Sequence, residues 1–282
     1  MSYLTNFSKV MNRKIKDGGK RFLGKYSNTI RDIYGLNEID LLFDRVAAIQ
    51  DVYLPASVHH QKVFPKYKDI YREKTVVITG TGPTFEKYEP INDAIHIAIN
   101  RSILNKTIDY SYFFCSDYGE EIKEALEYLY VYKKEVVKFF PYKQNYHISG
   151  AVPAKYIDDK NVETYYCDEI GWNHKSYKKI SKYTFPIDIS CMPLKTYCTT
   201  MHLALQFALW THPKKICLVG ADCSNGYASN LGYKGNTSLE YLIRPWKEIA
   251  EFVSAFYSDI EMVSINPVGL KGIFRDEYTT SR

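Results

Sequence analysis

From about residue 74 onwards, short apolar runs alternate with polar or glycine-rich stops. The run at 76–79, Val-Val-Ile-Thr, is followed directly by Gly-Thr-Gly-Pro at 80–83. A short apolar run bounded by turn residues predicts a strand buried on both faces, as in a parallel sheet. The glycines predict a tight loop at the carboxyl end of this strand, where open α/β sheets bind nucleotides.

The same rhythm predicts the other elements of the sheet. Further strands are expected at 94–100, 110–115, 135–140, 215–219 and 261–266, and helices at 120–132, 199–210 and 239–257. Thr199 stands where a threonine caps the amino end of a helix. Alternating strands and helices predict an α/β, Rossmann-like fold with a mostly parallel sheet flanked by helices.

Two regions depart from this rhythm. Residues 1–72 carry no strand signal and are expected to form a helical, basic appendage, with an amphipathic helix at 39–46 and a connector around His59-His60. Adjacent residues do not face the same way, so this histidine pair is interpreted as surface or capping residues. Residues 73–282 are expected to form the nucleotide-binding domain. Within it, the polar, tyrosine-rich segment at about 142–196 is interpreted as a lid-like insertion.

Polar residues stand at the ends of the first three predicted strands. They are Thr81, Asn100 and Asp117. The carboxyl ends of parallel strands meet at one edge of a sheet, so we expect these side chains to converge there. Gly220-Ala221-Asp222 ends the predicted strand at 215–219 in the same manner.

Composition and charge restrict the class of protein. The chain has 282 residues, of which 45% are hydrophobic and 24% charged, as in soluble globular proteins. Much of the net charge of +5 lies in the first thirty residues, which hold seven lysines and arginines against Asp17 alone. Two interpretations of this segment stay open, a peripheral contact with an anionic membrane surface or a solvated basic arm. Nucleic acid is disfavoured as a partner because no nucleic-acid-binding motif accompanies the charge.

The cysteines and the apolar runs bear on location. Six cysteines occur without the spacing of a zinc site and are expected to be reduced thiols. No signal peptide is evident, and no apolar run approaches the roughly 20 residues that span a bilayer. We therefore expect a cytoplasmic protein, with the inner face of the cell membrane as the site of any peripheral contact.

The strand ends, the helix start at Thr199-Thr200 and the closing Ile265-Asn266-Pro267 together resemble the bacterial sialyltransferases of glycosyltransferase family 42. They also resemble related proteins with a pterin-pyrophosphokinase-like Rossmann domain. The likeness covers residues 74–270. It implies a single GT-A-like nucleotide-binding domain and transfer of a sialic acid or Kdo type of sugar from a CMP-activated donor. The implied reaction is an inverting displacement without a metal or other cofactor, onto a glycan or lipid-linked glycan of the cell surface, such as lipopolysaccharide or capsule.

The resemblance also implies which residues contact the nucleotide. We assign this role to the loops and the helix start that match the family pattern: Gly80, Thr81, Gly82, Pro83, Asn100, Arg101, Ser102, Asp117, Thr199, Thr200, Gly220 and Asp222. Tyr227 and Tyr233 fall where the family places tyrosines that hold the departing phosphate. The chain departs from the pattern at Thr81, where the family has asparagine, and at Met201, where it has glycine.

The general base is the largest departure. The family carries a histidine base after the aspartate strand, whereas this chain has no histidine after His212. His147 and His174 in the insertion are the histidine candidates, although an ordinary surface role is favoured for each, and Asp188 is a carboxylate candidate. His202, near a helix start, is interpreted as a packing or capping residue.

Two other functions stay open at this stage. The first is an ATP-dependent diphosphokinase of the pterin-pyrophosphokinase-like group, which needs magnesium, with Asp117 and Asp222 as the ligands. The second is a non-catalytic nucleotide- or glycan-binding protein that has lost its base. The sequence leaves the acceptor, the linkage and the oligomeric state open.

Overall fold

The computed structural model describes residues 46, 48–116, 119–142, 152–169, 184–197, 199–231 and 240–279. The chain divides into two compact units, Met1–Val52 and Tyr53–Arg282. The described part of the first unit consists of Val46 and residues 48–52, which include most of the short π-helix η2 (Ile49–Tyr53). The second unit contains the sheet and the candidate site.

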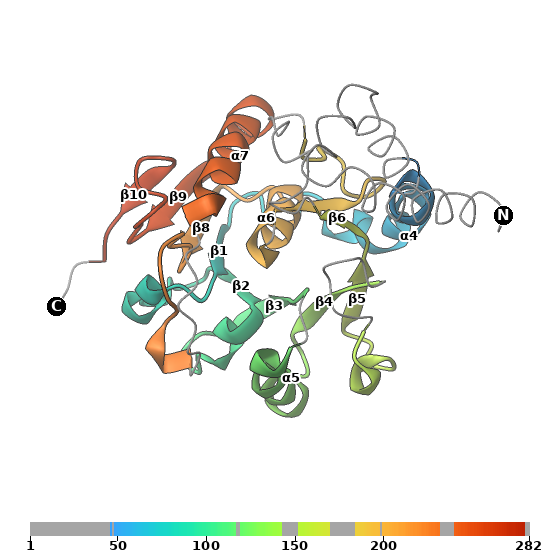
Figure 1. Ribbon diagram of the computed structural model, residues 1–282, viewed down its shortest axis with the longest axis horizontal. Coiled ribbons are helices and arrows are strands. Elements are labelled where there is room, and N and C mark those ends of the chain that lie inside the picture. Colours follow the sequence, from blue (N-terminus) through green and yellow to red (C-terminus); the bar gives the residue numbers. More distant parts are fainter. Residues whose placement is uncertain are drawn as a thin grey trace, which may run out of the picture. The chain divides into compact units, whose positions relative to one another are not determined.

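An eight-stranded sheet forms the centre of the second unit (Figure 1). Its strand order is β10-β9-β8-β1-β2-β3-β4-β5, and every neighbouring pair is parallel. The strands are β1 (Thr75–Thr79), β2 (Ile95–Ile99), β3 (Tyr110–Phe114), β4 (Val137–Pro141), β5 (Val162–Tyr165), β8 (Lys215–Val219), β9 (Glu261–Ile265) and β10 (Arg275–Glu277). The predicted α/β, Rossmann-like fold is confirmed.

The strand order reverses beside β1. This strand has β2 on one side and β8 on the other, and the chain continues outward in both directions, to β5 and to β10. Along the sheet, the chain therefore continues from β1 to β2 on one side and from β8 to β9 on the other. In open α/β sheets, ligands bind outside the carboxyl ends of the strands at such a reversal.

Helices cover both faces of the sheet. One face carries α4 (Leu54–Val63), α6 (Thr200–Trp210) and α7 (Ile243–Phe256), and α5 (Glu120–Tyr132) covers the other (Figure 1). The face of α5 also carries the short 3₁₀ helices η4 (Pro83–Lys87), η5 (Asn100–Leu104), η6 (Ala154–Tyr156) and η8 (Ser229–Leu231). Val76 and Ile78 of β1 belong to the first apolar cluster and Val77 to the second, as expected of a strand buried on both faces.

Every residue of α6 is buried. The hydroxyl oxygen of Thr199 accepts a hydrogen bond from the amide of Met201 at 3.3 Å, so the predicted cap is confirmed. The imidazole of His202 is fully buried and lies edge-on to the Trp246 ring, with 4.9 Å between centroids. Burial lowers its pKa to about 3. His202 is therefore a packing residue, as the sequence indicated.

The segment that precedes β1 was expected to be a connector and is in part a helix. Pro55 lies in the first turn of α4, directly after the π-helix η2. Ala56, Val63 and Phe64 are buried in the second unit. The boundary expected after residue 72 therefore lies earlier, at Tyr53. Of the helix expected at 39–46, only Val46 belongs to the described residues.

His60 of α4 is fully buried, so the surface role expected for it is wrong. Its Nδ1 lies 2.9 Å from the carbonyl oxygens of both Ile189 and Met192, and its Nε2 accepts the amide of Tyr166 at 2.8 Å. These contacts require a neutral ring with the proton on Nδ1. Burial lowers the pKa of His60 to about 4, and the two carbonyl contacts offset part of this effect.

The described parts of the expected insertion contribute to the core. β5 extends the main sheet, and a second, two-stranded parallel sheet pairs β6 (Cys167–Glu169) with β7 (Leu194–Thr196). Tyr156 and Tyr165 are fully buried. These stretches continue the fold rather than cover it. Residues 143–151 and 170–183, with His147 and His174, lie outside the described residues, and a lid-like role stays a prediction for them.

The side chain of Gln206 joins this small sheet to α6. Its amide oxygen accepts the backbone amide of Lys195 at 2.9 Å, and its amide nitrogen donates to the Lys195 carbonyl at 2.6 Å. A side chain thus supplies the hydrogen bonds that a neighbouring strand would supply to β7.

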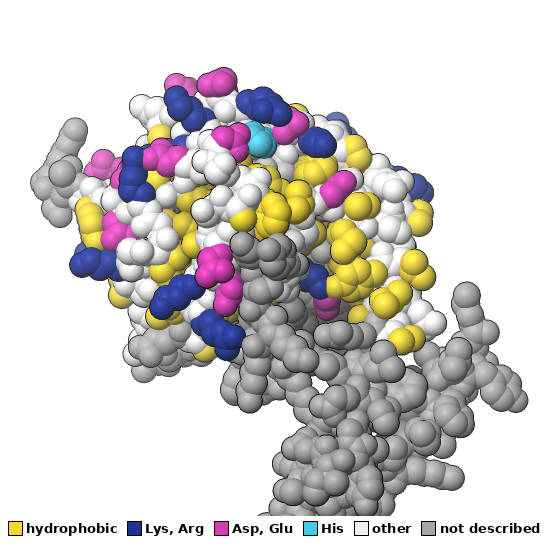
Figure 2. Space-filling view, turned by 90° about the horizontal axis from the view of Figure 1, so that it is seen from above, with side chains coloured by type: hydrophobic (Ala, Val, Ile, Leu, Met, Phe, Trp, Pro, Cys, Tyr) yellow, Lys and Arg dark blue, Asp and Glu magenta, His cyan; other side chains and the backbone are white. Residues whose placement is uncertain are grey.

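The surface of the described residues mixes charged and apolar side chains. Figure 2 shows acidic and basic side chains interspersed over one part of the face seen from above, and hydrophobic side chains gathered on another part. The large hydrophobic side chains exposed on the second unit include Leu54, Val58, Ile187 and Met192. Within the described residues, no helix combines the length and the apolar character needed to cross a bilayer.

Candidate functional site

The carboxyl ends of β1, β2, β3 and β8 bring the candidate site together. The glycine loop follows β1, Asn100 follows β2, Ser116 lies two residues beyond β3, and Gly220 follows β8. The hydroxyl oxygens of Ser116 and Thr200 are 2.6 Å apart, which joins the first turn of α6 to the end of β3. The predicted convergence of the strand ends is therefore present at the reversal of strand order.

The glycine loop packs directly on the loop that follows β8. The amide of Gly80 donates to the Val219 carbonyl at 2.7 Å, and that of Gly82 to the Gly220 carbonyl at 2.9 Å. A Cβ atom on Gly80 would lie 2.6 Å from the Gly220 oxygen, so no side chain fits. The glycines thus allow two loops of the protein to touch, and both amides are engaged within the protein.

Asp222 is buried behind this loop. Its carboxylate accepts the backbone amide of Thr84 at 2.8 Å and also the Thr84 hydroxyl. Burial raises the pKa of Asp222, and the two bonds from Thr84 offset part of this rise. Asp222 therefore caps the start of η4 rather than facing solvent. Proline directly after a glycine loop indicates the start of a helix. The amide of the next residue, Thr84, has no partner within such a helix, so a side chain such as Asp222 has to accept it.

Asn100 combines two unfavourable features. Its backbone is in the left-handed region, with φ of 51°. Its side-chain oxygen Oδ1 is buried without a hydrogen-bond partner among the described residues. Left-handed backbone at a residue other than glycine and an unsatisfied buried acceptor each cost about 1–3 kcal/mol, and both features concentrate at ligand sites. Asn100 is thus the strongest single sign of a ligand site at this edge.

Two substitutions separate the backbone of Asn100 from its side chain. Asn100→Ala places a Cβ-bearing residue without a polar group in the left-handed region, whereas Asn100→Gly removes the amide without backbone strain. We expect the free energy of unfolding to be about 1 kcal/mol higher for the glycine variant than for the alanine variant. Urea unfolding of both variants measures the difference, and equal stabilities would contradict the strain.

The two residues after Asn100 face the protein interior. Ser102 is fully buried, and its hydroxyl oxygen accepts from the Thr79 hydroxyl at 2.9 Å and from the Ile99 amide at 2.8 Å. It also donates to the Thr79 carbonyl at 2.9 Å. Arg101 donates from Nε to the Leu231 carbonyl at 2.6 Å. The nucleotide contact expected of Ser102 is therefore corrected, because its buried hydroxyl links β1 to η5.

Met201 takes up the space between α6 and the glycine loop. A Cβ atom on Gly80 would lie 2.5 Å from the Met201 Cε atom, and Met201 itself is buried. The departure from the family pattern at this position thus has a physical consequence. A flexible thioether fills the volume beside Gly80, next to the helix cap Thr199.

Of two further candidate residues, Tyr227 lies near the glycine loop and Asp188 does not. The amide of Ala228 donates to the Thr81 carbonyl at 2.8 Å, which holds the half-buried Tyr227 near the glycine loop. Asp188 is exposed and accepts the amide of Ser190 at 2.8 Å in a local turn.

The neighbours of Asp188 show which end of the sheet it is near. The hydroxyl of Tyr257 donates to the Ile187 carbonyl at 3.1 Å. Tyr257 ends α7 and leads into the amino end of β9, opposite the glycine loop. This position does not support the predicted catalytic role of Asp188.

Several predicted residues lie outside the described part of the chain. They are Asp117, His147, His174 and Tyr233. Within the described part, no group of three or more His, Cys, Asp or Glu side chains is arranged to hold a metal ion.

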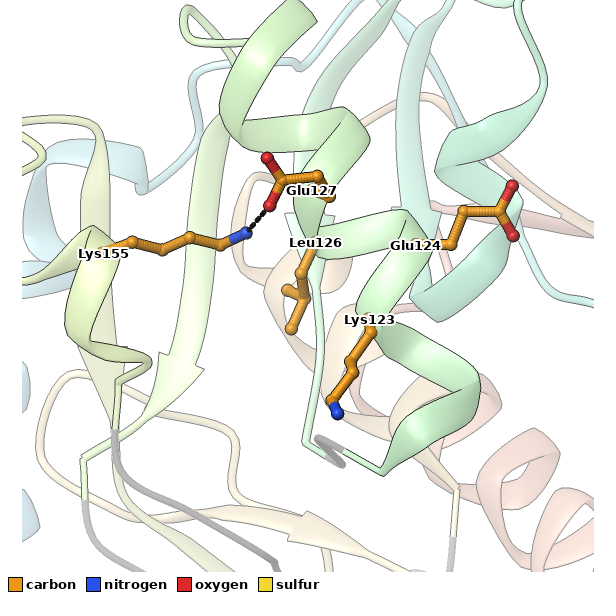
Figure 3. A pocket seen from close by; sticks show the side chains of 5 residues that line it. All are labelled: Lys123, Glu124, Leu126, Glu127 and Lys155. Carbon is orange, nitrogen blue, oxygen red and sulfur yellow. Dashed lines mark hydrogen bonds and ion pairs between the residues drawn. The ribbon is translucent and has the colours of Figure 1, made fainter.

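A shallow depression of about 520 Å³ lies elsewhere, between α5 and η6 (Figure 3). Its lining residues are Lys123, Glu124, Leu126, Glu127 and Lys155. Lys155 is paired with Glu127 at 2.5 Å, and Lys123 with Glu120 at 2.5 Å. Because these charges pair within the protein and none of the residues was predicted to bind nucleotide, the carboxyl edge remains the candidate site.

Comparison with known proteins gives matches among solved structures. No protein-family model and no curated protein sequence matches the chain. A variant of the sialyltransferase CST-II in complex with CMP is similar at 18% identity over 68% of this chain and 80% of that chain, with a TM-score of 0.42. CstII from Campylobacter jejuni with cytidine-5'-monophosphate is similar at 16% identity over 68% of this chain and 79% of that chain, with a TM-score of 0.39.

A third structure in this comparison belongs to a longer protein. The MAf glycosyltransferase from Magnetospirillum magneticum AMB-1 is similar at 13% identity, with a TM-score of 0.43. The match covers 80% of this chain and 38% of that chain. Two of these three structures are therefore of sialyltransferases, and the third is of a glycosyltransferase.

Proposed function

We propose that the chain is a glycosyltransferase that transfers a sugar of the sialic acid or Kdo type from a CMP-activated donor to a glycan acceptor. Its nucleotide site lies at the carboxyl edge, where the glycine loop, Asn100 and the start of α6 meet. Asn100 is the observation that carries the proposal, because it combines a left-handed backbone with a buried amide oxygen that has no hydrogen-bond partner among the described residues. The CMP donor rests on the resemblance of these same loops to the sialyltransferases.

The residues at this edge suit binding of a nucleotide phosphate. The Asn100 side-chain oxygen is an acceptor for an amino or hydroxyl group of the nucleoside. The amino end of α6 carries the positive end of the helix dipole and lies beside the end of β3, where it favours a phosphate. Met201 limits the volume beside Gly80 and so restricts the part of the donor that lies there.

In the proposed reaction, an acceptor oxygen forms a bond to the anomeric carbon as the bond from that carbon to the phosphate oxygen breaks. CMP leaves with the electron pair, and the configuration inverts. Negative charge grows on the phosphate, so a hydroxyl donor such as that of Tyr227 lowers the barrier without a metal. The acceptor proton passes to a base. His147 and His174 remain candidates for that base.

The proposed acceptor rests on the family resemblance and on the basic amino-terminal segment of the sequence. We infer a glycan or lipid-linked glycan as acceptor, with the basic amino-terminal segment drawn to the anionic membrane that carries it. A sedimentation assay of the full chain with liposomes tests this contact. We expect the chain to sediment with anionic liposomes but not with neutral ones, and no sedimentation with either would refute the contact.

Thermal unfolding with nucleotides tests the nucleotide site. We expect CMP, in the presence of a chelator, to stabilise the chain by about 2.7 kcal/mol at a concentration 100 times its Kd. This corresponds to a rise in Tm of roughly 5 °C for a chain of this size. UDP, GDP and ADP are expected to have smaller effects. Release of CMP from a CMP-activated sugar, measured with the acceptor present, distinguishes an enzyme from a binding protein.

Two asparagine variants make this test specific. Asn100→Gly should abolish most of the stabilisation by CMP, because it removes the amide and leaves the backbone unstrained. The matched control is Asn105→Ala, which changes an asparagine whose Oδ1 accepts from the amide and hydroxyl of Thr107 in a local turn. Stabilisation by ATP that requires magnesium would instead favour the diphosphokinase, and no response to any nucleotide would refute the proposed site.

A further inference from the structure

Charged side chains from two neighbouring elements hold the short helix η8 at its two ends. Glu86 of η4 accepts the amides of Ser229 and Asn230 at the start of η8 through Oε1. Arg101 of η5 donates from Nε to the carbonyl of Leu231, the last residue of η8, at 2.6 Å. A carboxylate thus meets free amide donors and a guanidinium meets a free carbonyl, the arrangement that helix ends favour.

The burial of Arg101 makes its contact with η8 unusual. Only 7% of the residue is exposed. Its Nη2 lies 2.5 Å from a carboxylate oxygen of Glu124, but 69% of that side chain is exposed, so solvent screens this ion pair. A buried cation is unfavourable unless its donors are satisfied. The bond from Nε to the Leu231 carbonyl is charge-assisted and buried, so solvent weakens it less than the contact with the exposed Glu124.

The segment that Arg101 holds is tied to the glycine loop. The amide of Ala228 donates to the Thr81 carbonyl at 2.8 Å. Ala228 is fully buried, and Leu231 is 2% exposed. These contacts fix the backbone on the carboxyl side of Tyr227 at three points, namely the glycine loop, Glu86 and Arg101.

We propose that Arg101 is a positioning residue for the transfer reaction, which it serves by holding residues 227–231, and with them the Tyr227 hydroxyl, at the glycine loop. This inference rests on the proposed function. It assigns Arg101 a role through the protein backbone in place of the direct nucleotide contact expected from the sequence. Glu86 supports the same segment from its other end.

The proposed role predicts a particular kinetic pattern. Asn100 and the start of α6 bind the nucleotide in the ground state, whereas the Tyr227 hydroxyl gains importance as charge develops on the phosphate. Loss of positioning should therefore lower kcat with little effect on donor affinity. A direct contact between Arg101 and the nucleotide would instead weaken donor binding.

The test combines steady-state kinetics with amide hydrogen exchange on the full chain. Arg101→Met keeps an unbranched apolar stem but removes the donors, and Arg101→Lys keeps the charge and a single donor group. We expect exchange of the Ala228 to Leu231 amides to be at least tenfold faster in Arg101→Met. We expect kcat to fall about tenfold or more, with the Kd for CMP changed less than about threefold. Arg101→Lys should lie between this variant and the natural chain.

Arg72→Met is the matched control. The Arg72 side chain is 60% exposed and pairs with Asp69 at 3.1 Å, so its loss should change neither quantity. If Arg101→Met does not fold, Arg101→Lys and Glu86→Gln provide the same comparison. The proposal is overturned if amide exchange at 228–231 or kcat is unchanged in Arg101→Met. It is also overturned if a loss of CMP affinity accounts for the loss of rate.

The two proposals fail in different ways. If the natural chain releases no CMP from any CMP-activated sugar, the proposed function is refuted. The exchange rates then still decide, without reference to activity, whether Arg101 holds the segment. If the natural chain is active and exchange in Arg101→Met is unchanged, the positioning role alone is refuted.

Discussion

Gly82→Ala should reduce the free energy of unfolding by about 3 kcal/mol, at the upper end of the cost of overpacking. A Cβ atom at this position would lie 2.3 Å from the Asp222 Oδ2 atom and 2.7 Å from the Gly220 carbonyl oxygen. The backbone of Gly82 has φ of −67°, which any residue adopts, so the whole cost is steric. Urea unfolding measures it.

Gly226→Ala is the matched control for this prediction. Gly226 has φ of 85°, and an added Cβ atom would meet nothing within 4 Å. Its cost is therefore backbone strain alone, about 1 kcal/mol. If the two variants lose the same free energy of unfolding, the glycine loop and the loop after β8 must move apart to admit the new Cβ atom with no steric cost. Such a result would contradict the close packing of the candidate site.

Lowering the pH from 7.5 to 5 should cost the fold about 4 kcal/mol through its two neutral, buried histidines. Burial lowers the pKa of His60 to about 4 and that of His202 to about 3, from an ordinary value of 6.5. Below pH 6.5, the unfolded chain binds a proton at each ring that the folded chain does not bind. Stability is therefore fully present above pH 6.5 and is lost as the pH falls toward the pKa values of the folded state.

Urea unfolding at several pH values checks this dependence. Near pH 5 the slope should approach about 2.7 kcal/mol per pH unit, the value for uptake of two protons on unfolding. His60→Gln or His202→Gln should each reduce the slope by about half, whatever its effect on stability at pH 7.5. A slope that does not change in either variant would show that other groups cause the loss.

The main sheet was predictable because its strands are short apolar runs between clear stops. Strand β8 and helix α5 begin and end at the predicted residues, 215–219 and 120–132. A strand buried on both faces must be apolar throughout, and the loop after it must turn sharply, so both signals are local in sequence.

The elements that the sequence did not predict depend on distant partners. α4 contains both histidines of the pair, where the sequence predicted a connector. The strands β6 and β7 have three residues each, too few for a periodic pattern, and β7 owes part of its hydrogen bonding to Gln206. β10 is equally short. Tertiary contacts, rather than local preference, determine these elements.

The candidate site was predictable in position and less so in detail. The sequence placed Thr81 and Asn100 at one edge of the sheet, because the carboxyl ends of parallel strands must meet there. It did not show that Asp222 and Ser102 face inward, since a polar residue at a strand end serves equally well as a ligand contact or as a partner for a buried amide. Burial and hydrogen-bond partners decide between these roles.

The complete burial of α6 has a consequence for biosynthesis. The helix is buried on all sides and mostly apolar, and α7, one of the elements that cover the same face of the sheet, is made after it. While the chain is being synthesised, α6 therefore presents an apolar surface that the later part of the chain must cover. We infer that incomplete chains ending before α7 are the form of this protein most prone to aggregation and most dependent on chaperones.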